Sequence, residues 1–213
     1  MMRIESVSAQ PDRAGRYRVC LEDGSVLRLY RQTVEDFGLY AGKELDEKEQ
    51  GNLLAAAGKM SAKMRAVRII SASSVSKRDL ERRLVQKGEK AADAQQAVAW
   101  MEELNLLDDQ KTARQVVDRC IGKGYGLARA KQALYEKRIP KEYWEEALAE
   151  YPDQIEKILE YLHSRLGEQW EEKDLRRATD SLLRRGHSYG EIRKALQIYA
   201  EDADLREEQE WQM

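Results

Sequence analysis

A seventeen-residue motif occurs twice in this chain, and it restricts the possible fold more than any other feature. The first copy runs from Asp118 to Leu134, and the second begins sixty-two positions later and runs from Asp180 to Leu196. Superposing the two copies places Gly124 on Gly186, just after a run with helical apolar spacing. A glycine at that place is typical of a helix end. Each copy therefore predicts the end of one helix, a glycine turn and a second helix.

A weaker third copy lies upstream, where residues 71–84 align fifty positions before residues 121–134. Internal similarity at a spacing of about 50 to 60 residues is typical of helical repeat proteins. The expected fold is therefore mainly α, with three tandem three-helix repeats. We expect these repeats to occupy residues 61–107, 108–151 and 152–213, the last of them with an acidic tail.

Residues 1–60 are expected to form a small β-meander followed by a helix. Residues 16–21 and 25–30 alternate polar and apolar side chains on either side of a tight-turn sequence, and residues 3–7 fit a third strand. Asp46, with Glu49 three positions later, is typical of a capped helix start, and that helix is expected to end near Ala57. Residues 58–61 are the expected joint to the helical repeats.

Two segments of the third repeat are left open by the sequence. Residues 153–172 are longer than simple repetition requires, so they either extend the first helix of this repeat or form an elbow after the second repeat. The acidic residues 202–211 fit either a final helix or a frayed end.

The formal net charge of −2 hides an uneven distribution of charged residues along the chain. Basic residues outnumber acidic ones by 8 to 4 in residues 108–140 and by 7 to 3 in residues 173–200, whereas residues 141–172 carry 3 basic against 10 acidic residues. Stacking of the repeats would bring basic side chains near the glycine turns into one stripe, which suits a polyanion or an acidic protein surface. An ordinary solvated helix face is the alternative for each residue taken singly. The candidate binding residues are Arg82, Arg83, Lys123, Arg129, Lys131, Arg184, Arg185, Arg193 and Lys194.

No catalytic, metal or cofactor site is predicted. Cys20 and Cys120 lie a hundred residues apart without a neighbouring metal-ligand motif, and His163 and His187 have no nucleophile at a motif spacing. The glycines of residues 122–126 lack the spacing of a phosphate loop. Without a signal peptide or an apolar run of eighteen residues, the protein is expected to be cytoplasmic and to have no membrane contact.

Several short motifs, in order and at the same spacing, resemble the RecX family of recombination regulators. They are Ser76-Lys-Arg-Asp-Leu-Glu-Arg-Arg-Leu84, Leu107-Asp-Asp109 followed by Ala113, and Arg119-Cys-Ile-Gly-Lys-Gly124 leading to Leu134-Tyr-Glu-Lys137. The resemblance covers about residues 62–200. Departures include Asn105 in place of a usual Gly, and Thr112 where an aromatic residue is common.

The resemblance implies an elongated, curved array of repeats and a non-enzymatic protein. It also implies binding along the filament of the RecA recombinase, with inhibition of ATP hydrolysis, strand exchange and filament assembly, and contact with DNA through that filament. We expect a monomer without a cofactor. Two other functions remain possible from the residues alone. One is a separate helical DNA- or RNA-binding protein, and the other is a helical scaffold for protein interactions.

Overall fold

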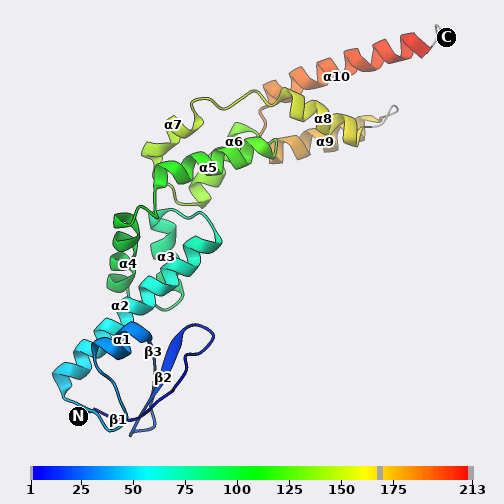
Figure 1. The fold of residues 1–213 in the computed structure, drawn as a ribbon. Helices are drawn as coiled ribbons and strands as arrows, with labels where there is room; N and C mark the ends of the chain where they lie inside the picture. The colour runs from blue at the N-terminus through cyan, green and yellow to red at the C-terminus, as the bar shows by residue number, and fades with distance from the viewer. Residues whose placement is uncertain (1, 167–169, 211–213) are drawn as a thin grey trace. The chain divides into compact units, whose positions relative to one another are not determined.

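The structure, a computed structural model, describes residues 2–166 and 170–210. For residues 202–210 it describes the backbone alone. The chain divides into two compact units, Met1–Asp108 and Asp109–Met213. Both are rich in helix, and an antiparallel sheet lies near the N-terminus (Figure 1). The expected mainly α class with a small N-terminal sheet is confirmed. Among the described helices, none combines the length and the apolar character needed to cross a membrane.

The sheet of the first unit has four strands, one more than expected. They are β1 (Met2–Val7), β2 (Arg16–Leu21), β3 (Val26–Tyr30) and β4 (Glu44–Leu45), in the spatial order β3-β2-β1-β4. Each neighbouring pair is antiparallel. The three predicted strands are confirmed. Strand β4 was missed because two residues are too short to show an alternating pattern.

Helix α1 (Arg31–Asp36) follows the sheet, and helix α2 (Glu47–Ala72) then runs without a break through residues 58–61. The expected joint there is therefore wrong. The predicted capping box is confirmed, because Glu49 N donates to Asp46 Oδ1 at 2.7 Å and Asp46 N donates to Glu49 Oε2 at 3.0 Å. Gly58 serves close packing instead of a turn, since a Cβ atom on it would lie 2.7 Å from Oδ2 of Asp93 on a neighbouring helix.

Two further helices complete the first unit, α3 (Lys77–Gln86) and α4 (Ala91–Glu103). Ser76 caps the start of α3, with Asp79 N donating to Ser76 Oγ at 3.1 Å. Helices α2, α3 and α4 enclose one apolar cluster that includes Leu80, Leu84 and Met101. After α4, Asn105 has a positive φ of 55°, a conformation that Asn tolerates better than most residues and that Gly adopts freely.

The second unit consists of six helices and one short 3-10 helix, among the described residues. They are α5 (Asp109–Gly122), α6 (Leu127–Glu136), the 3-10 helix η1 (Lys141–Tyr143), α7 (Trp144–Leu148), α8 (Ile155–Arg165), α9 (Glu172–Arg184) and α10 (Tyr189–Glu210). Both copies of the repeated motif therefore form a helix, a glycine turn and a helix. Residues 202–210 continue α10, so they are neither a separate helix nor a frayed end, and residues 211–213 lie outside the described part.

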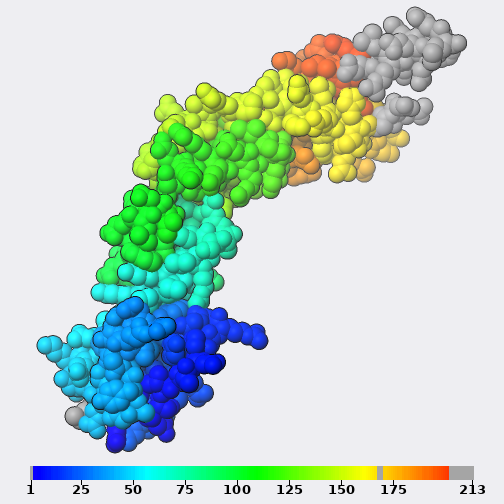
Figure 2. All heavy atoms as spheres, viewed as in Figure 1, coloured from blue at the N-terminus to red at the C-terminus, as the bar shows by residue number. Residues whose placement is uncertain are grey.

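The sequence left open whether residues 153–172 extend the first helix of the third repeat or form an elbow. The structure has a separate helix there, α8. It packs with α9 and α10 around one apolar cluster that includes Ile158, Leu162, Leu182 and Ile192. A second cluster joins α5, α6 and α7. Within this unit, the atoms of α5 to α8 (green to yellow) form much of the face that Figure 2 shows.

The division of the chain into one N-terminal region and three repeats stays a prediction. Four separate apolar clusters support it. The cluster of the sheet and the cluster of the first repeat meet along α2, between Ala57 and Ala62. A boundary near residue 60 would therefore lie within one continuous helix.

Candidate functional site

The two copies of the glycine turn are in direct contact in the second unit. Gly126 N, at the start of α6, donates a hydrogen bond to the carbonyl oxygen of Arg185 at 3.0 Å, and Ala128 N donates to the carbonyl oxygen of Gly186 at 3.2 Å. The repeated sequence thus forms a joint between two helix pairs. Two backbone hydrogen bonds therefore cross this joint and satisfy polar groups of both turns.

Two glycines make this close approach possible. Gly126 has an ordinary φ of −76°, but a Cβ atom on it would lie 2.1 Å from the carbonyl oxygen of Gly186. Gly186 has a φ of +87°, and its Cβ would lie 2.3 Å from Arg129 N. Both distances are far below van der Waals contact, so neither position accepts a side chain without separating the turns.

Two side chains hold the joint from inside. His187, which is 4% exposed, places Nε2 at 3.1 Å from the carbonyl oxygen of Gly124. Tyr151 donates from its hydroxyl to the carbonyl oxygen of Tyr125 at 2.6 Å. Burial raises the pKa of Tyr151 to about 12 and lowers the pKa of His187 below 6.5. Both groups are therefore neutral near pH 7.

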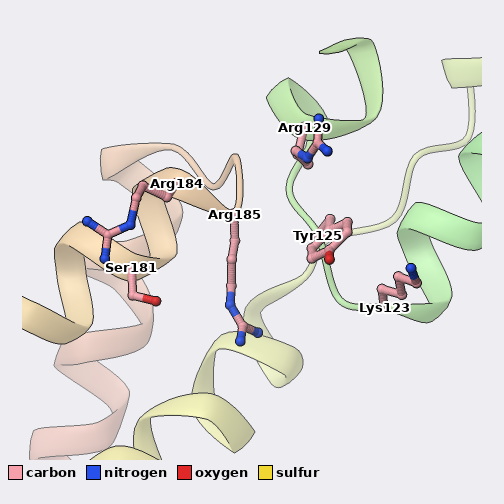
Figure 3. Close-up of a pocket in the computed structure, with 6 residues that line it drawn as sticks. All are labelled: Lys123, Tyr125, Arg129, Ser181, Arg184 and Arg185. Carbon is pink, nitrogen blue, oxygen red and sulfur yellow. The ribbon is translucent and has the colours of Figure 1, made fainter. Parts of the chain in front are cut away.

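A basic pocket of about 450 Å³ opens beside this joint (Figure 3). Lys123, Tyr125 and Arg129 come from the first turn and α6, whereas the other lining residues come from α9 and its end. The Arg184 and Arg185 side chains point in different directions, and that of Arg185 extends toward α8. The full lining is Lys123, Tyr125, Arg129, Ser181, Arg184 and Arg185.

A second pocket of about 320 Å³ shares Lys123 and Arg185 with the first and extends over α8. Besides Glu160 and Ser164, helix α8 contributes three residues with a positive charge or an aromatic ring to its lining, Lys157, Tyr161 and Arg165. The Arg185 guanidinium lies 4.4 Å from the centre of the Tyr161 ring, which is within cation–π range. The two pockets together form a surface that we call the basic pocket pair.

Sequence reasoning missed the three residues from α8 because they belong to a segment with a large acidic excess. The signal was present in their spacing, since Lys157, Tyr161 and Arg165 follow each other at intervals of four and so share one helix face. Two of the basic residues of the basic pocket pair form ion pairs with acidic neighbours, which reduces the positive charge of the surface. Lys157 Nζ lies 2.8 Å from Glu160, and Arg129 lies 3.0 Å from Glu136.

Of the nine predicted binding residues, the structure gathers four in the basic pocket pair, namely Lys123, Arg129, Arg184 and Arg185. Three others, Lys131 on α6 and Arg193 and Lys194 on α10, are exposed but are not among the lining residues.

The last two predicted residues, Arg82 and Arg83, belong to the first unit. Each has a nitrogen at 2.8 Å from a carboxylate oxygen of Asp79, which is 1% exposed. A buried carboxylate requires such partners. Arg82 and Arg83 therefore have a structural role in α3, within a different unit from the basic pocket pair.

The basic pocket pair is suited to binding an anion and contains none of the usual nucleophile and base pairs. Among the side chains that the structure describes, no three His, Cys, Asp or Glu residues come together as metal ligands would. Cys120 is buried, and desolvation raises the pKa of its thiol, which makes the thiolate scarce at neutral pH.

Comparison with known proteins points to one family. Residues 108–148 match the family model described as "RecX, second three-helix domain". The regulatory protein RecX of Vibrio parahaemolyticus is 29% identical over 146 residues, which are 67% of this chain and 94% of that protein. The regulatory protein RecX of Clostridioides difficile is 22% identical over 199 residues, which cover 91% of this chain and 93% of that protein.

Solved structures agree on the fold. A crystal structure of a regulatory protein RecX superposes with a TM-score of 0.59 at 22% identity and covers 91% of this chain and all of the other. The crystal structure of RecX from Lactobacillus salivarius gives a TM-score of 0.57, also at 22% identity, over 68% of this chain and 98% of the other. The matched repeat and the curated relatives thus make the chain similar to the RecX regulatory proteins over most of its length, and the solved structures show that it shares their fold.

Proposed function

We propose that this protein is a non-enzymatic regulator that binds a RecA-type recombinase filament on DNA. In this role it mainly inhibits the ATPase activity, strand exchange and assembly of the filament. Similarity to the RecX family supports the proposal, since its relatives are regulatory proteins. The observation that carries it is the gathering of Lys123, Arg129, Arg184 and Arg185 at the joint between two repeats.

The chemistry of the basic pocket pair supports binding more than catalysis. Apart from Glu160, the charged residues of its lining are cationic, and the aromatic rings of Tyr125 and Tyr161 lie among them. A surface of this kind binds through several charge pairs and planar contacts, each of modest strength. A filament presents acidic side chains and DNA phosphates at regular intervals, so one extended regulator can make many such contacts.

The remaining parts of the proposal concern how the protein reaches the filament. We propose that it acts as a cytoplasmic monomer, that its repeats occupy residues 61–107, 108–151 and 152–213, and that it meets DNA through the filament. Lys131, Arg193 and Lys194 would add contacts outside the basic pocket pair.

The test is to add the purified protein to RecA filaments on single-stranded DNA and to follow ATP hydrolysis. The expected result is a decrease that depends on protein concentration and becomes smaller as the salt concentration rises, because screening weakens charge pairs at an exposed surface. Unchanged hydrolysis at every stoichiometry would contradict the proposal. Binding to duplex DNA alone, with no response to the recombinase, would instead favour a separate DNA-binding function.

A further inference from the structure

We infer that His187 is a positioning residue for the basic pocket pair, which is assembled only while this histidine is uncharged. The inference rests on the proposed function in one respect, because it takes the basic pocket pair to be the binding surface. Its structural part, the control of the joint between the glycine turns, stands independently of any partner.

The surroundings of the His187 ring suit the neutral form, with a hydrogen on Nε2 and none on Nδ1. Nε2 lies 3.1 Å from the carbonyl oxygen of Gly124, which only accepts, so Nε2 carries the hydrogen. Nδ1 is buried and has no hydrogen-bond partner among the described residues. A proton on Nδ1 would therefore be a buried donor without an acceptor, which is unfavourable by itself and more so for an ion.

The charged groups around the imidazole do not compensate for its burial. Glu191, one turn further along α10, favours the charged form, whereas Arg185 on the preceding turn opposes it. From the other side of the joint come Arg129, whose backbone meets Gly186, and Lys123, which precedes Gly124. Cys120 and Tyr151 both bond to Tyr125 in the first turn. Burial raises the pKa of both, so they stay neutral near pH 7. Burial of the ring is therefore the largest influence on the pKa of His187, and it outweighs the attraction of Glu191.

The position of His187 connects its charge to the basic pocket pair. It follows Gly186 directly and bonds to Gly124, so the two turns that carry Arg185 and Lys123 are joined through its ring. The bond itself favours the charged ring, but it does not offset the desolvation of a buried imidazolium. A protonated ring is therefore driven toward solvent, which breaks the bond, and the turns and the residues shared by both pockets then move apart.

The sign of the pH effect follows from the lowered pKa. Above 6.5, the ordinary pKa of a histidine, the folded and unfolded chains both hold His187 neutral, and its contribution to stability is complete. As the pH falls below 6.5, the unfolded chain takes up the proton first, so the folded state loses stability relative to it. The loss continues until the pH reaches the lower pKa of the folded state.

This behaviour is opposite to that of a histidine that acts only by charge. Adding a positive charge next to four basic residues would strengthen the binding of an anion. A positioning role predicts weaker binding when His187 is protonated, because the basic residues are no longer held together. The direction of the change therefore separates the two roles.

The experiment uses the full-length chain and a short oligothymidylate, a phosphodiester probe whose charge is constant between about pH 5.5 and pH 7.5. Binding is measured at both ends of this range at constant ionic strength. In parallel, the ring signals of His163 and His187 and the amide signals of residues 123–126 and 185–187 are followed by NMR.

Three proteins are compared: the wild type, His187→Gln and His163→Gln. Glutamine at 187 keeps an N–H that can reach the Gly124 carbonyl but does not become charged in this range. His163→Gln removes the only other histidine and serves as the matched control. Circular dichroism at each pH shows whether the helices remain formed.

We expect the wild type and His163→Gln to bind the probe several-fold more weakly at the lower pH, with shifts of the amide signals at both turns. His187→Gln should bind with little dependence on pH. Amide signals that do not move when His187 titrates would overturn the positioning role, as would equal pH dependence in His187→Gln. If the turns respond to pH but the probe never binds, the positioning role stands and the proposed use of the basic pocket pair is wrong.

Discussion

At the scale of single residues, Gly126 is the clearest test of the contact between the turns. Its φ of −76° suits any residue, so alanine introduces no backbone strain, yet the new Cβ would lie 2.1 Å from the carbonyl oxygen of Gly186. We expect Gly126→Ala to lower the free energy of unfolding by about 2–3 kcal/mol, as overpacking does. Chemical denaturation monitored by circular dichroism measures this change.

The matched control is Gly122→Ala, four residues earlier. Gly122 ends α5, its φ is not positive, and a Cβ there would meet nothing within 4 Å. We expect no loss of stability and a gain of up to about 1 kcal/mol. Equal effects of the two substitutions would contradict close docking of the turns.

A second residue-scale prediction concerns Asp79. Its buried carboxylate accepts ion pairs from Arg82 and Arg83, which are themselves about one third exposed. Asp79→Ala should lower the free energy of unfolding by about 1–3 kcal/mol, less than for a fully buried pair because solvent screens the arginines. Arg78→Ala, at an exposed position of the same helix, should change it by less than about 0.5 kcal/mol. If Asp79→Ala leaves the free energy of unfolding unchanged, the structural role of Arg82 and Arg83 is wrong, and both remain candidate binding residues.

The sequence predicted the identity of several site residues but not their partners. Lys123 and Arg185 could be singled out because each precedes a repeated glycine. The bond from His187 to Gly124 joins positions 63 residues apart, and no local pattern encodes such a contact. The sequence therefore excluded a catalytic motif at His187 but did not indicate its role at the joint. Arg82 and Arg83 show the converse, because a basic pair looks the same in sequence whether it faces solvent or a buried carboxylate.

At the scale of helices, the sequence reported most starts and ends correctly and failed where glycine had a packing role. Capping residues and positive-φ glycines act locally, so their signals are readable in a single sequence. Gly58 was taken for a joint, but it lies within α2 and permits close approach of Asp93 from α4. The acidic net charge of residues 141–172 also hid the basic residues of α8. A net charge is a sum over the whole helix surface, so it does not show the one face that carries Lys157, Tyr161 and Arg165.

Helix α2 offers an internal comparison of two glycines. A Cβ at Gly51 would meet nothing within 4 Å, whereas one at Gly58 would lie 2.7 Å from Asp93 Oδ2. Gly51→Ala should raise the free energy of unfolding by about 0.5–1 kcal/mol through helix propensity alone. Gly58→Ala should fall short of that gain or reverse it, because the Asp93 side chain must move. Thermal unfolding of both variants measures the difference, and equal gains would contradict the packing role of Gly58.

At the scale of the whole molecule, internal repetition was sufficient to predict a mainly α protein, because a unit that recurs cannot bury its apolar faces alone. The way in which the repeats meet was not predictable. It depends on the fit of two backbone turns, which only three-dimensional contact reveals. The functional consequence is that basic residues from separate helix pairs converge on one surface in the second unit.

The most direct test of this account compares two charge reversals of equal size in the RecA filament assay. Arg184→Glu with Arg185→Glu changes the basic pocket pair, whereas Lys131→Glu with Arg193→Glu changes exposed helix faces outside its lining. We predict that the first double variant, with helical content unchanged, needs at least about tenfold more protein for half-maximal inhibition, a loss of about 1.4 kcal/mol. The second should lose clearly less. Full inhibition by the folded first variant, or equal losses in both, would contradict the assignment of the basic pocket pair as the binding surface.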